Sequence, residues 1–244
     1  MDGLTVALTK GRLAARTIDL FIRAGVVREE MREILDEASR RLIFSSEEPR
    51  LSFFMAKAQD VPTYVDYGAA DVGIAGKDTL LEEERNLYEV LDLKFGLCRM
   101  VVAGREETRD RLRYGNNLRV ATKYPRIALD YFGRKKQQTV EIVRLNGSVE
   151  LAPIVGLADV IVDIVETGAT LAENDLSILE EITPLSARMV VNRASMKMRR
   201  VRIAELITKL RNALTSEEKT ENKKKGLQGD RASSAPLSFD GGRR

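Results

Sequence analysis

The 244-residue chain contains no histidine and no tryptophan, and its only cysteine is Cys98. Without histidine it cannot form a Ser-His-Asp triad, a Cys-His pair or a histidine metal site, and it has no imidazole for acid–base chemistry. A single cysteine excludes an internal disulfide and a cysteine-based zinc cluster. Because Cys98 lies in an apolar run, we expect it to pack in the core rather than act as a nucleophile.

Long apolar runs are also missing. No run approaches the roughly 20 residues of a membrane span, and the N-terminus lacks the apolar segment of a signal peptide. The sequence therefore predicts a soluble, cytoplasmic protein with no membrane partner. The net charge is only +3, and the residues from Ser216 onward carry +2 of it. This small excess argues against a protein that holds nucleic acid by bulk charge.

The most informative stretch that is present is Asp159–Leu171. Its first half is apolar and β-branched, as in a buried parallel strand, apart from Asp163. Its second half is a small, hydroxylated turn made of Glu166, Thr167, Gly168, Ala169 and Thr170. A strand, a small-residue turn and a helix N-terminus can bind phosphate, because backbone N–H groups and the helix dipole favour an anion. The alternative is an ordinary connection with a threonine cap.

The charge of Asp163 favours the phosphate site. Burying a carboxylate costs several kcal/mol unless the group has a partner or a function. Below a phosphate turn, this carboxylate could accept hydrogen bonds from sugar hydroxyls. A second strand and turn occur at Leu4–Leu8 and Thr9–Leu13, where Lys10 and Arg12 flank Gly11. These two cations suit another anion, and the alternative is a solvated turn.

An internal match concerns the overall architecture. Gly68–Val72 and Gly156–Val160 share the pattern Gly-x-Ala-Asp-Val, and each follows a predicted helix that begins at a capping residue, Asp60 or Ser148. The match predicts two similar α/β lobes that face each other across a ligand-binding cleft. The alternative is chance, because this pattern is a common way for a helix to end.

Six runs in order resemble the short form of ATP phosphoribosyltransferase, the first enzyme of histidine biosynthesis. They are Ala7–Leu13, Asp60–Val65, Ala70–Asp78, Val120–Pro125, Leu145–Glu150 and Asp163–Leu171. The resemblance implies an α/β fold with two similar lobes around a cleft, like a type II periplasmic binding protein. We expect lobe I to contain residues 1–95 and 186–215, and lobe II residues 96–185. The polar composition of residues 216–244 predicts a disordered tail.

The resemblance also implies the reaction and its residues. The enzyme joins N1 of ATP to C1 of phosphoribosyl pyrophosphate and releases pyrophosphate. Asp163 and Glu150 would hold the donor ribose, and Glu166, Thr167, Gly168, Ala169 and Thr170 its 5-phosphate. The catalytic set would be Lys10, Arg12, Lys57 and Asp163, and the ATP site would contain Lys10, Gly11, Arg12, Asp71 and Gly73. Mg²⁺ would be bound through the substrate phosphates, with no metal ligand assigned among the residues.

One residue departs from the family. Many relatives have Arg where Lys57 stands, so its share in stabilising the leaving group stays open, since lysine is a point charge and arginine a bidentate donor. Two alternative functions also remain. A nucleobase phosphoribosyltransferase usually carries two adjacent acids before the loop, whereas Asp163 stands alone. A non-catalytic anion-binding module of the same shape would not need the second anion site at Lys10 and Arg12.

The resemblance finally implies partners. The short form works with a regulatory subunit that resembles histidyl-tRNA synthetase, so we expect a hetero-oligomer that contains at least a homodimer of this chain. Candidate contact surfaces are the apolar stripe of a helix over Met196–Leu214 and the predicted strands Arg41–Phe44 and Leu51–Ala56.

Overall fold

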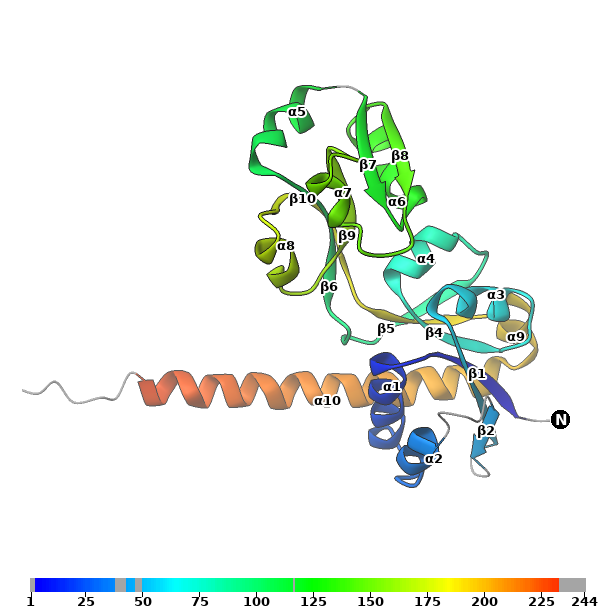
Figure 1. The fold of residues 1–244 in the computed structure, drawn as a ribbon. Coiled ribbons are helices and arrows are strands. Elements are labelled where there is room, and N and C mark those ends of the chain that lie inside the picture. Colours follow the sequence, from blue (N-terminus) through cyan, green and yellow to red (C-terminus); the bar gives the residue numbers. More distant parts are fainter. Residues whose placement is uncertain (1–2, 38–42, 47–49, 116, 233–244) are drawn as a thin grey trace, which may run out of the picture.

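The computed structural model describes residues 3–37, 43–46, 50–115 and 117–232. They form two α/β lobes, one above the other, and a long C-terminal helix runs along the lower lobe (Figure 1). Each lobe is built around its own sheet. This arrangement agrees with the α/β fold and the two lobes that the sequence predicts.

The lower lobe, lobe I, contains a six-stranded sheet in the order β2-β3-β1-β4-β11-β5. Its strands are β1 Leu4–Thr9, β2 Ile43–Ser46, β3 Leu51–Ala56, β4 Val72–Gly76, β5 Tyr88–Asp92 and β11 Ala187–Val191. Its helices are α1 Arg12–Arg23, α2 Met31–Glu37, the 3-10 turn Ala58–Asp60, α3 Val61–Asp66, α4 Lys77–Glu83, α9 Arg193–Met198 and α10 Arg200–Ala232. β1 runs parallel to both β3 and β4, so these three strands end at the same edge of the sheet.

Side chains that alternate along each strand divide the core of lobe I into two layers. Val6 and Leu8 of β1 face α1, α2 and α10, whereas Ala7 between them faces α3. Both faces of the sheet are therefore covered by helices. This explains why β1 is apolar almost without interruption.

The upper lobe, lobe II, contains a five-stranded sheet in the order β10-β6-β9-β7-β8. Its strands are β6 Cys98–Gly104, β7 Leu118–Thr122, β8 Val140–Arg144, β9 Val160–Val165 and β10 Ser177–Leu185. Its helices are the 3-10 turn Glu106–Thr108, α5 Arg109–Tyr114, α6 Pro125–Asp130, the π-turn Tyr131–Lys135, α7 Leu151–Ile154 and α8 Ala169–Glu173. β7 runs parallel to β8 and β9. The α5 and α6 side chains pack on one face, and those of α7 and α8 on the other.

Two crossings join the lobes. Residues 93–97 connect β5 to β6, and Ser186 connects β10 to β11. Hydrogen bonds tie the crossings to each other: the Ala187 N–H donates to the Phe95 carbonyl at 2.9 Å, and the Ser186 hydroxyl donates to Asp92 at 2.8 Å. Lys94 and Gly96 have positive φ angles of 60° and 63°. The crossings form a two-stranded hinge with a sharply turned backbone.

The internal match in the sequence corresponds to a repeated structural unit. Gly68 and Gly156 end their helices with φ angles of 74° and 73°. The next acid in each unit, Asp71 or Asp159, accepts a hydrogen bond at 2.8 Å from a backbone N–H in the neighbouring strand. The donors are Thr5 in lobe I and Arg119 in lobe II. The unit therefore fixes one strand against the next in the same way in both lobes.

The C-terminal prediction needs correction. The single helix expected over Met196–Leu214 is two helices, α9 and α10, which meet at Arg199. The disorder expected from Ser216 stays a prediction, and the described part of this segment is drawn as a continuation of α10 to Ala232, beyond the body of lobe I (Figure 1). Lysine, glutamate and glutamine have high helix propensity, and extending a formed helix requires no new nucleation. Residues 233–244 and Arg41 lie outside the described residues.

Candidate active site

The predicted cations lie together where the parallel strands of lobe I end. β1 ends beside β3, with Thr9 opposite Ala56, and the Lys10 N–H donates to the Ala56 carbonyl at 3.1 Å. Lys10 and Lys57 therefore follow adjacent strand ends, and both are exposed. In sheets of this kind ligands bind outside the carboxyl ends of the strands. The two lysines are available to an anion in the cleft.

Gly11 directs the next cation across the cleft. It has a φ of 93° and precedes α1, a conformation that glycine adopts without strain. Arg12 follows as the first residue of the helix, and its guanidinium lies 3.4 Å from the Glu166 carboxylate of lobe II. The two side chains are 89% and 61% exposed, so this contact stabilises the lobes by only about 0–1 kcal/mol. A substrate phosphate could displace Glu166 from Arg12 at little cost.

Residues 166–170, which we call the phosphate loop, lie opposite at the end of β9. Gly168 has φ 87° and ψ 3° and precedes α8. The Thr167 hydroxyl accepts a hydrogen bond from the Ala169 N–H at 3.3 Å. The first N–H groups of a helix have no partner within the helix. The loop, which is mostly exposed, is therefore suited to an anionic group.

Asp163 lies half-buried in β9, three residues before the phosphate loop. Burial raises the pKa of its carboxyl above the ordinary value, the charges of Glu150 and Asp78 raise it further, and the Ile164 N–H and Lys123 oppose the shift. The charge of Asp163 is therefore opposed by two other acids, Glu150 and Asp78, and favoured by Lys123. Such a cluster favours a ligand that brings hydroxyl donors or positive charge.

Three residues in this cluster were not assigned to the site from the sequence: Asp78, Lys123 and Tyr124. Burial, followed by the charges of Asp78 of lobe I and of Asp163, raises the pKa of the Tyr124 hydroxyl well above its ordinary value. The tyrosine therefore stays a neutral donor between the lobes. Asp78 ends the resembling run Ala70–Asp78, and the other two lie in Val120–Pro125. The sequence therefore marked both runs, but it did not show that residues of the two runs lie close together in the fold.

A pocket of about 520 Å³ lies between the lobes next to the hinge. Its lining includes Arg12, Asp78 and Glu166, together with Gly96 and Cys98. Cys98 packs against the core of lobe II as expected, but it also reaches this pocket. Burial, with Asp78 and Glu166, raises the pKa of its thiol to about 11. The thiol stays protonated near neutral pH and is a poor nucleophile.

Two residues predicted for the ATP site lie elsewhere. Asp71 precedes β4, at the opposite end of the strand from Asp78, and it holds the Thr5 N–H, the Ser195 hydroxyl and the Arg199 guanidinium. Gly73 lies inside β4, where an added Cβ would come within 2.6 Å of a Val65 methyl. The structure gives both residues roles in the packing of lobe I and does not bring them to the cleft.

The comparisons with known proteins agree on one family. The profile of "HisG: ATP phosphoribosyltransferase" matches residues 57–212. A protein of Lachnoclostridium phytofermentans named ATP phosphoribosyltransferase is 60% identical over 215 residues, which are 88% of this chain and 99% of the relative. A protein of Lachnospira eligens with the same name is 59% identical over 217 residues, which are 89% and 99% of the two chains.

Solved structures give the same result. The chain superposes on the "ATP phosphoribosyl transferase (HisG:HisZ) complex from Thermotoga maritima" with a TM-score of 0.72 and 36% identity, covering 87% of this chain and 99% of the other. The periplasmic aliphatic sulphonate binding protein SsuA of Escherichia coli matches with a TM-score of 0.56 at 13% identity, covering 91% and 72%. The second likeness shows the fold alone. It confirms the predicted fold of two α/β lobes, like that of a periplasmic binding protein.

Proposed function

Since the chain belongs to the HisG family of ATP phosphoribosyltransferases, we propose that the cleft between its lobes is the active site for the family reaction. The chain catalyses the first step of histidine biosynthesis, in which the phosphoribosyl group of phosphoribosyl pyrophosphate moves to N1 of ATP. The bond from ribose C1 to the pyrophosphate oxygen breaks, and a bond from C1 to N1 of the adenine forms.

Lobe II binds the phosphoribosyl donor in this proposal. The phosphate loop, from Glu166 to Thr170, takes the 5-phosphate, because the positive φ of Gly168 turns the backbone towards the start of α8. Asp163 and Glu150 accept hydrogen bonds from the ribose hydroxyls. The raised pKa of Asp163 supports this role, because burial and the neighbouring acids destabilise its carboxylate and hydroxyl donors would stabilise it.

Lobe I binds the leaving pyrophosphate and the ATP phosphates. Lys10 and Lys57 lie at adjacent strand ends, and Arg12 with Gly11 begins α1 beside them. Positioned cations that meet the charge developing on a leaving group are a strong source of rate enhancement. The reaction needs no histidine, because positioning and electrostatic stabilisation carry it.

Mg²⁺ is the metal expected with these substrates. Among the described residues no group of three or more His, Cys, Asp or Glu could hold a metal ion. Mg²⁺ does not need such a cage, because substrate phosphates and one or two carboxylates hold it. Glu150 and Asp163 are the carboxylates that fit beside the phosphate loop. Once bound, the ion neutralises charge on the pyrophosphate.

The observation that carries the proposal is the contact between Arg12 and Glu166, because it places the cations that follow β1 and β3 opposite the phosphate loop. The test is pyrophosphate release from phosphoribosyl pyrophosphate with ATP, compared with the same assay on free nucleobases. We expect pyrophosphate release when ATP is the acceptor and none when a free nucleobase replaces it. Turnover with a nucleobase and not with ATP would replace this proposal by the nucleobase alternative, and no turnover would favour the binding module.

We also propose the partners and the division of the chain. The solved Thermotoga maritima structure is a HisG:HisZ complex, and we propose that this chain likewise binds a histidyl-tRNA-synthetase-like subunit, as at least a homodimer. Lobe I would comprise residues 1–95 and 186–215, and lobe II residues 96–185.

No helix in the described part of the chain is long and apolar enough to cross a membrane. ATP and phosphoribosyl pyrophosphate are made inside the cell, so we place the enzyme in the cytoplasm.

A further inference from the structure

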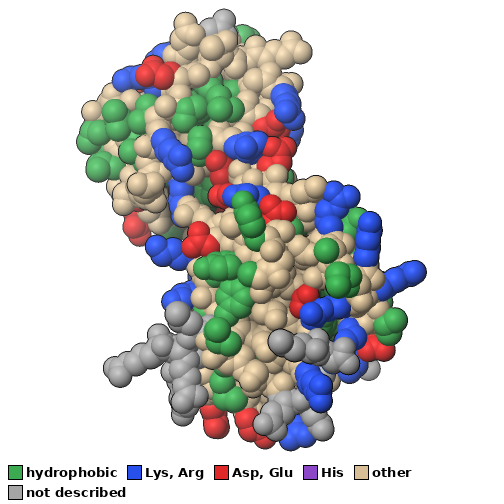
Figure 2. All heavy atoms as spheres, turned by 90° about the vertical axis from the view of Figure 1, so that its right-hand side faces the viewer, with side chains coloured by type: hydrophobic (Ala, Val, Ile, Leu, Met, Phe, Trp, Pro, Cys, Tyr) green, Lys and Arg blue, Asp and Glu red, His purple; other side chains and the backbone are tan. Residues whose placement is uncertain are grey.

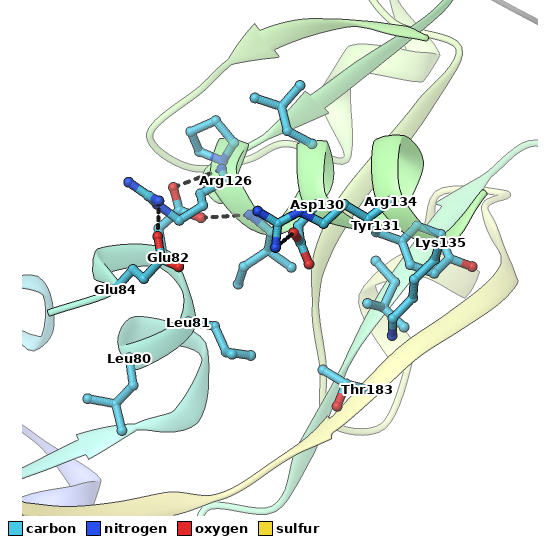
Figure 3. Close-up of a pocket in the computed structure, with 14 residues that line it drawn as sticks. Leu80, Leu81, Glu82, Glu84, Arg126, Asp130, Tyr131, Arg134, Lys135 and Thr183 are labelled. Carbon is cyan, nitrogen blue, oxygen red and sulfur yellow. Dashed lines mark hydrogen bonds and ion pairs between the residues drawn. The ribbon is translucent and has the colours of Figure 1, made fainter. Parts of the chain in front are cut away.

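A group of contacts outside the substrate cleft joins the lobes through α4 and α6. The two carboxylate oxygens of Glu82, on α4 of lobe I, accept hydrogen bonds at 3.1 Å from the backbone N–H groups of Arg126 and Ile127, on α6 of lobe II. Glu84 adds an ion pair with the Arg126 guanidinium. Figure 3 shows both acids turned towards the first turn of α6, and Figure 2 shows acidic and basic side chains gathered at the waist between the lobes.

The sequence of α6 leaves its first turn without a cap of its own. The residue at the N-cap position is Tyr124, which makes no side-chain cap, and Pro125 at the first helical position has no N–H. The next two N–H groups are those of Arg126 and Ile127, and both are taken by Glu82. A carboxylate at this position also interacts favourably with the helix dipole. The other lobe therefore supplies the cap.

The same face of α4 reaches the candidate active site. Asp78 and Glu82 are four residues apart, so they lie one above the other on the helix. The charge of Asp78 acts on the hydroxyl of Tyr124, the residue directly before the turn that Glu82 caps, and raises its pKa. The capped turn therefore fixes the segment that carries Lys123 and Tyr124 into the acidic cluster around Asp163.

We propose that Glu82 of α4 and Glu84, which directly follows α4, form a reversible clasp with Arg126 and Ile127 of α6, and that this clasp sets the closed arrangement of the two lobes. Glu82 is a positioning residue, because it acts through α6 on the groups in the cleft and touches no reacting atom. The catalytic part of this inference rests on the proposed function. A closed clasp holds the lobe I cations over the donor bound to lobe II.

The contacts of the clasp favour the closed arrangement of the lobes, and they are weak enough for the lobes to separate. Arg126 and Glu84 are 54% and 66% exposed, and exposed ion pairs are worth about 0–1 kcal/mol. When the lobes separate, water can hydrate the two freed N–H groups and the Glu82 carboxylate. A pocket of about 790 Å³ lies beside the clasp between α4, α6 and β10 (Figure 3). Two-lobed binding proteins close around ligands by hinge motion, and the turned backbone at Lys94 and Gly96 provides the hinge here.

Amide hydrogen exchange at single-residue resolution measures the clasp directly in the unmodified chain, without substrates. We expect the Arg126 and Ile127 amides to be protected, and Glu82→Ala to accelerate their exchange at least tenfold. Glu83→Ala is the matched control, since Glu83 lies on the same helix and pairs with Arg85 within lobe I. Equal exchange rates in Glu82→Ala and Glu83→Ala would show that no clasp exists, whatever the chain catalyses.

Kinetics test the positioning role separately. We expect Glu82→Ala to lower kcat about tenfold or more, and to leave KM for phosphoribosyl pyrophosphate within about twofold, because the donor site lies within lobe II. Glu84→Arg and Arg126→Glu should each lower kcat, and the double variant should recover it by restoring the ion pair. An unchanged kcat in a Glu82→Ala protein with rapid exchange would refute the positioning role. If the unmodified chain itself does not turn over ATP, the proposed function fails while the exchange result stands.

Discussion

At the scale of single residues, backbone conformation decides what the phosphate loop tolerates. Gly168 has a φ of 87°, which other residues rarely adopt. We expect Gly168→Val to weaken binding of phosphoribosyl pyrophosphate at least tenfold, measured by calorimetry, in a protein that still folds. Gly133→Val is the control, because a Cβ at Gly133 meets open space and the φ there is not positive. Unchanged donor affinity in folded Gly168→Val would rule the loop out as the phosphate site.

Asp163 illustrates a trade between stability and activity. Its pKa is raised in the folded protein, first by burial, so the ionised carboxylate is less stable there than in the unfolded chain. The stability that a raised pKa confers is present at low pH and lost as the pH rises through the folded value. At neutral pH we therefore expect Asp163→Asn to raise Tm, by about 2–4 °C for each kcal/mol recovered in a chain of this size.

The same substitution should reduce the rate. Removing one preorganised polar contact costs about 10²-fold in kcat, and we expect Asp163→Asn to lose at least that much. The wild-type rate should fall as the pH drops through the raised pKa, and this acidic limb should be absent from the pH profile of the variant. Wild-type turnover by Asp163→Asn, or a lower Tm, would contradict the assignment.

The sequence identifies such single residues of the site better than it identifies the residues that lie next to them in the folded protein. The isolated acid in an apolar strand and the glycine in a small-residue turn were visible because each breaks a local pattern. Asp78 and Tyr124 break no pattern, and they meet only because two strand ends from different lobes face each other. Asp71 shows the opposite case: this residue lies in one of the runs that resemble the family, but it holds the Thr5 N–H, a role that the local sequence cannot reveal.

At the scale of elements, the repeated unit fixes strand to strand. Burial opposes the ionised form of Asp159, yet the Arg119 N–H and the charges of Arg111 and Arg119 hold its pKa below the ordinary value. A lowered pKa stabilises the fold above the unfolded value, and this stability is lost as the pH falls through the folded value. Its side chain is only 13% exposed, so the free N–H left by a substitution would be costly.

We therefore expect Asp159→Ala to lower the free energy of unfolding by about 1–3 kcal/mol at neutral pH, measured by urea denaturation. The difference from wild type should shrink as the pH is lowered below the ordinary range of aspartate. Asp110→Ala, at an exposed position on α5, serves as the control and should change little. A difference that stays constant down to low pH would mean that the charge of Asp159 does not matter.

Hydrophobic periodicity locates buried elements well and says little about polar ones. The apolar runs at Leu4–Leu8 and Leu51–Ala56 became β1 and β3, because a strand covered on both faces must be apolar. The polar residues after Ser216 carried no such signal, although they extend a helix that is already packed against α1. There Arg23 and Glu217 form two hydrogen bonds of 2.8 Å. This pair lies at the position where composition predicted the start of disorder.

At the scale of the whole molecule, the described residues form two lobes, each built around its own sheet. The hinge and the clasp both join the lobes, and a pocket lined by residues of both lobes lies next to the hinge. Feedback by histidine requires a second site that is coupled to the first by differential binding. The curated relatives, which align over almost their whole length with 88–89% of this chain, are named for the catalytic activity. A separate subunit, as in the Thermotoga maritima HisG:HisZ complex, is therefore the place where we expect the regulatory site.

We accordingly expect the isolated chain to be insensitive to histidine, and sensitivity to appear when the synthetase-like subunit is added. The measurement is the rate of pyrophosphate release from ATP and phosphoribosyl pyrophosphate, with the chain alone and with the subunit, each with and without histidine. Because coupling is reciprocal, histidine should also change the affinity of the complex for the donor by the factor by which the donor changes the affinity for histidine. If that change passes through the lobes, histidine should alter exchange at the Arg126 and Ile127 amides in the complex and leave it unchanged in the isolated chain. Full inhibition of the isolated chain by histidine would place a regulatory site within this polypeptide and overturn the prediction.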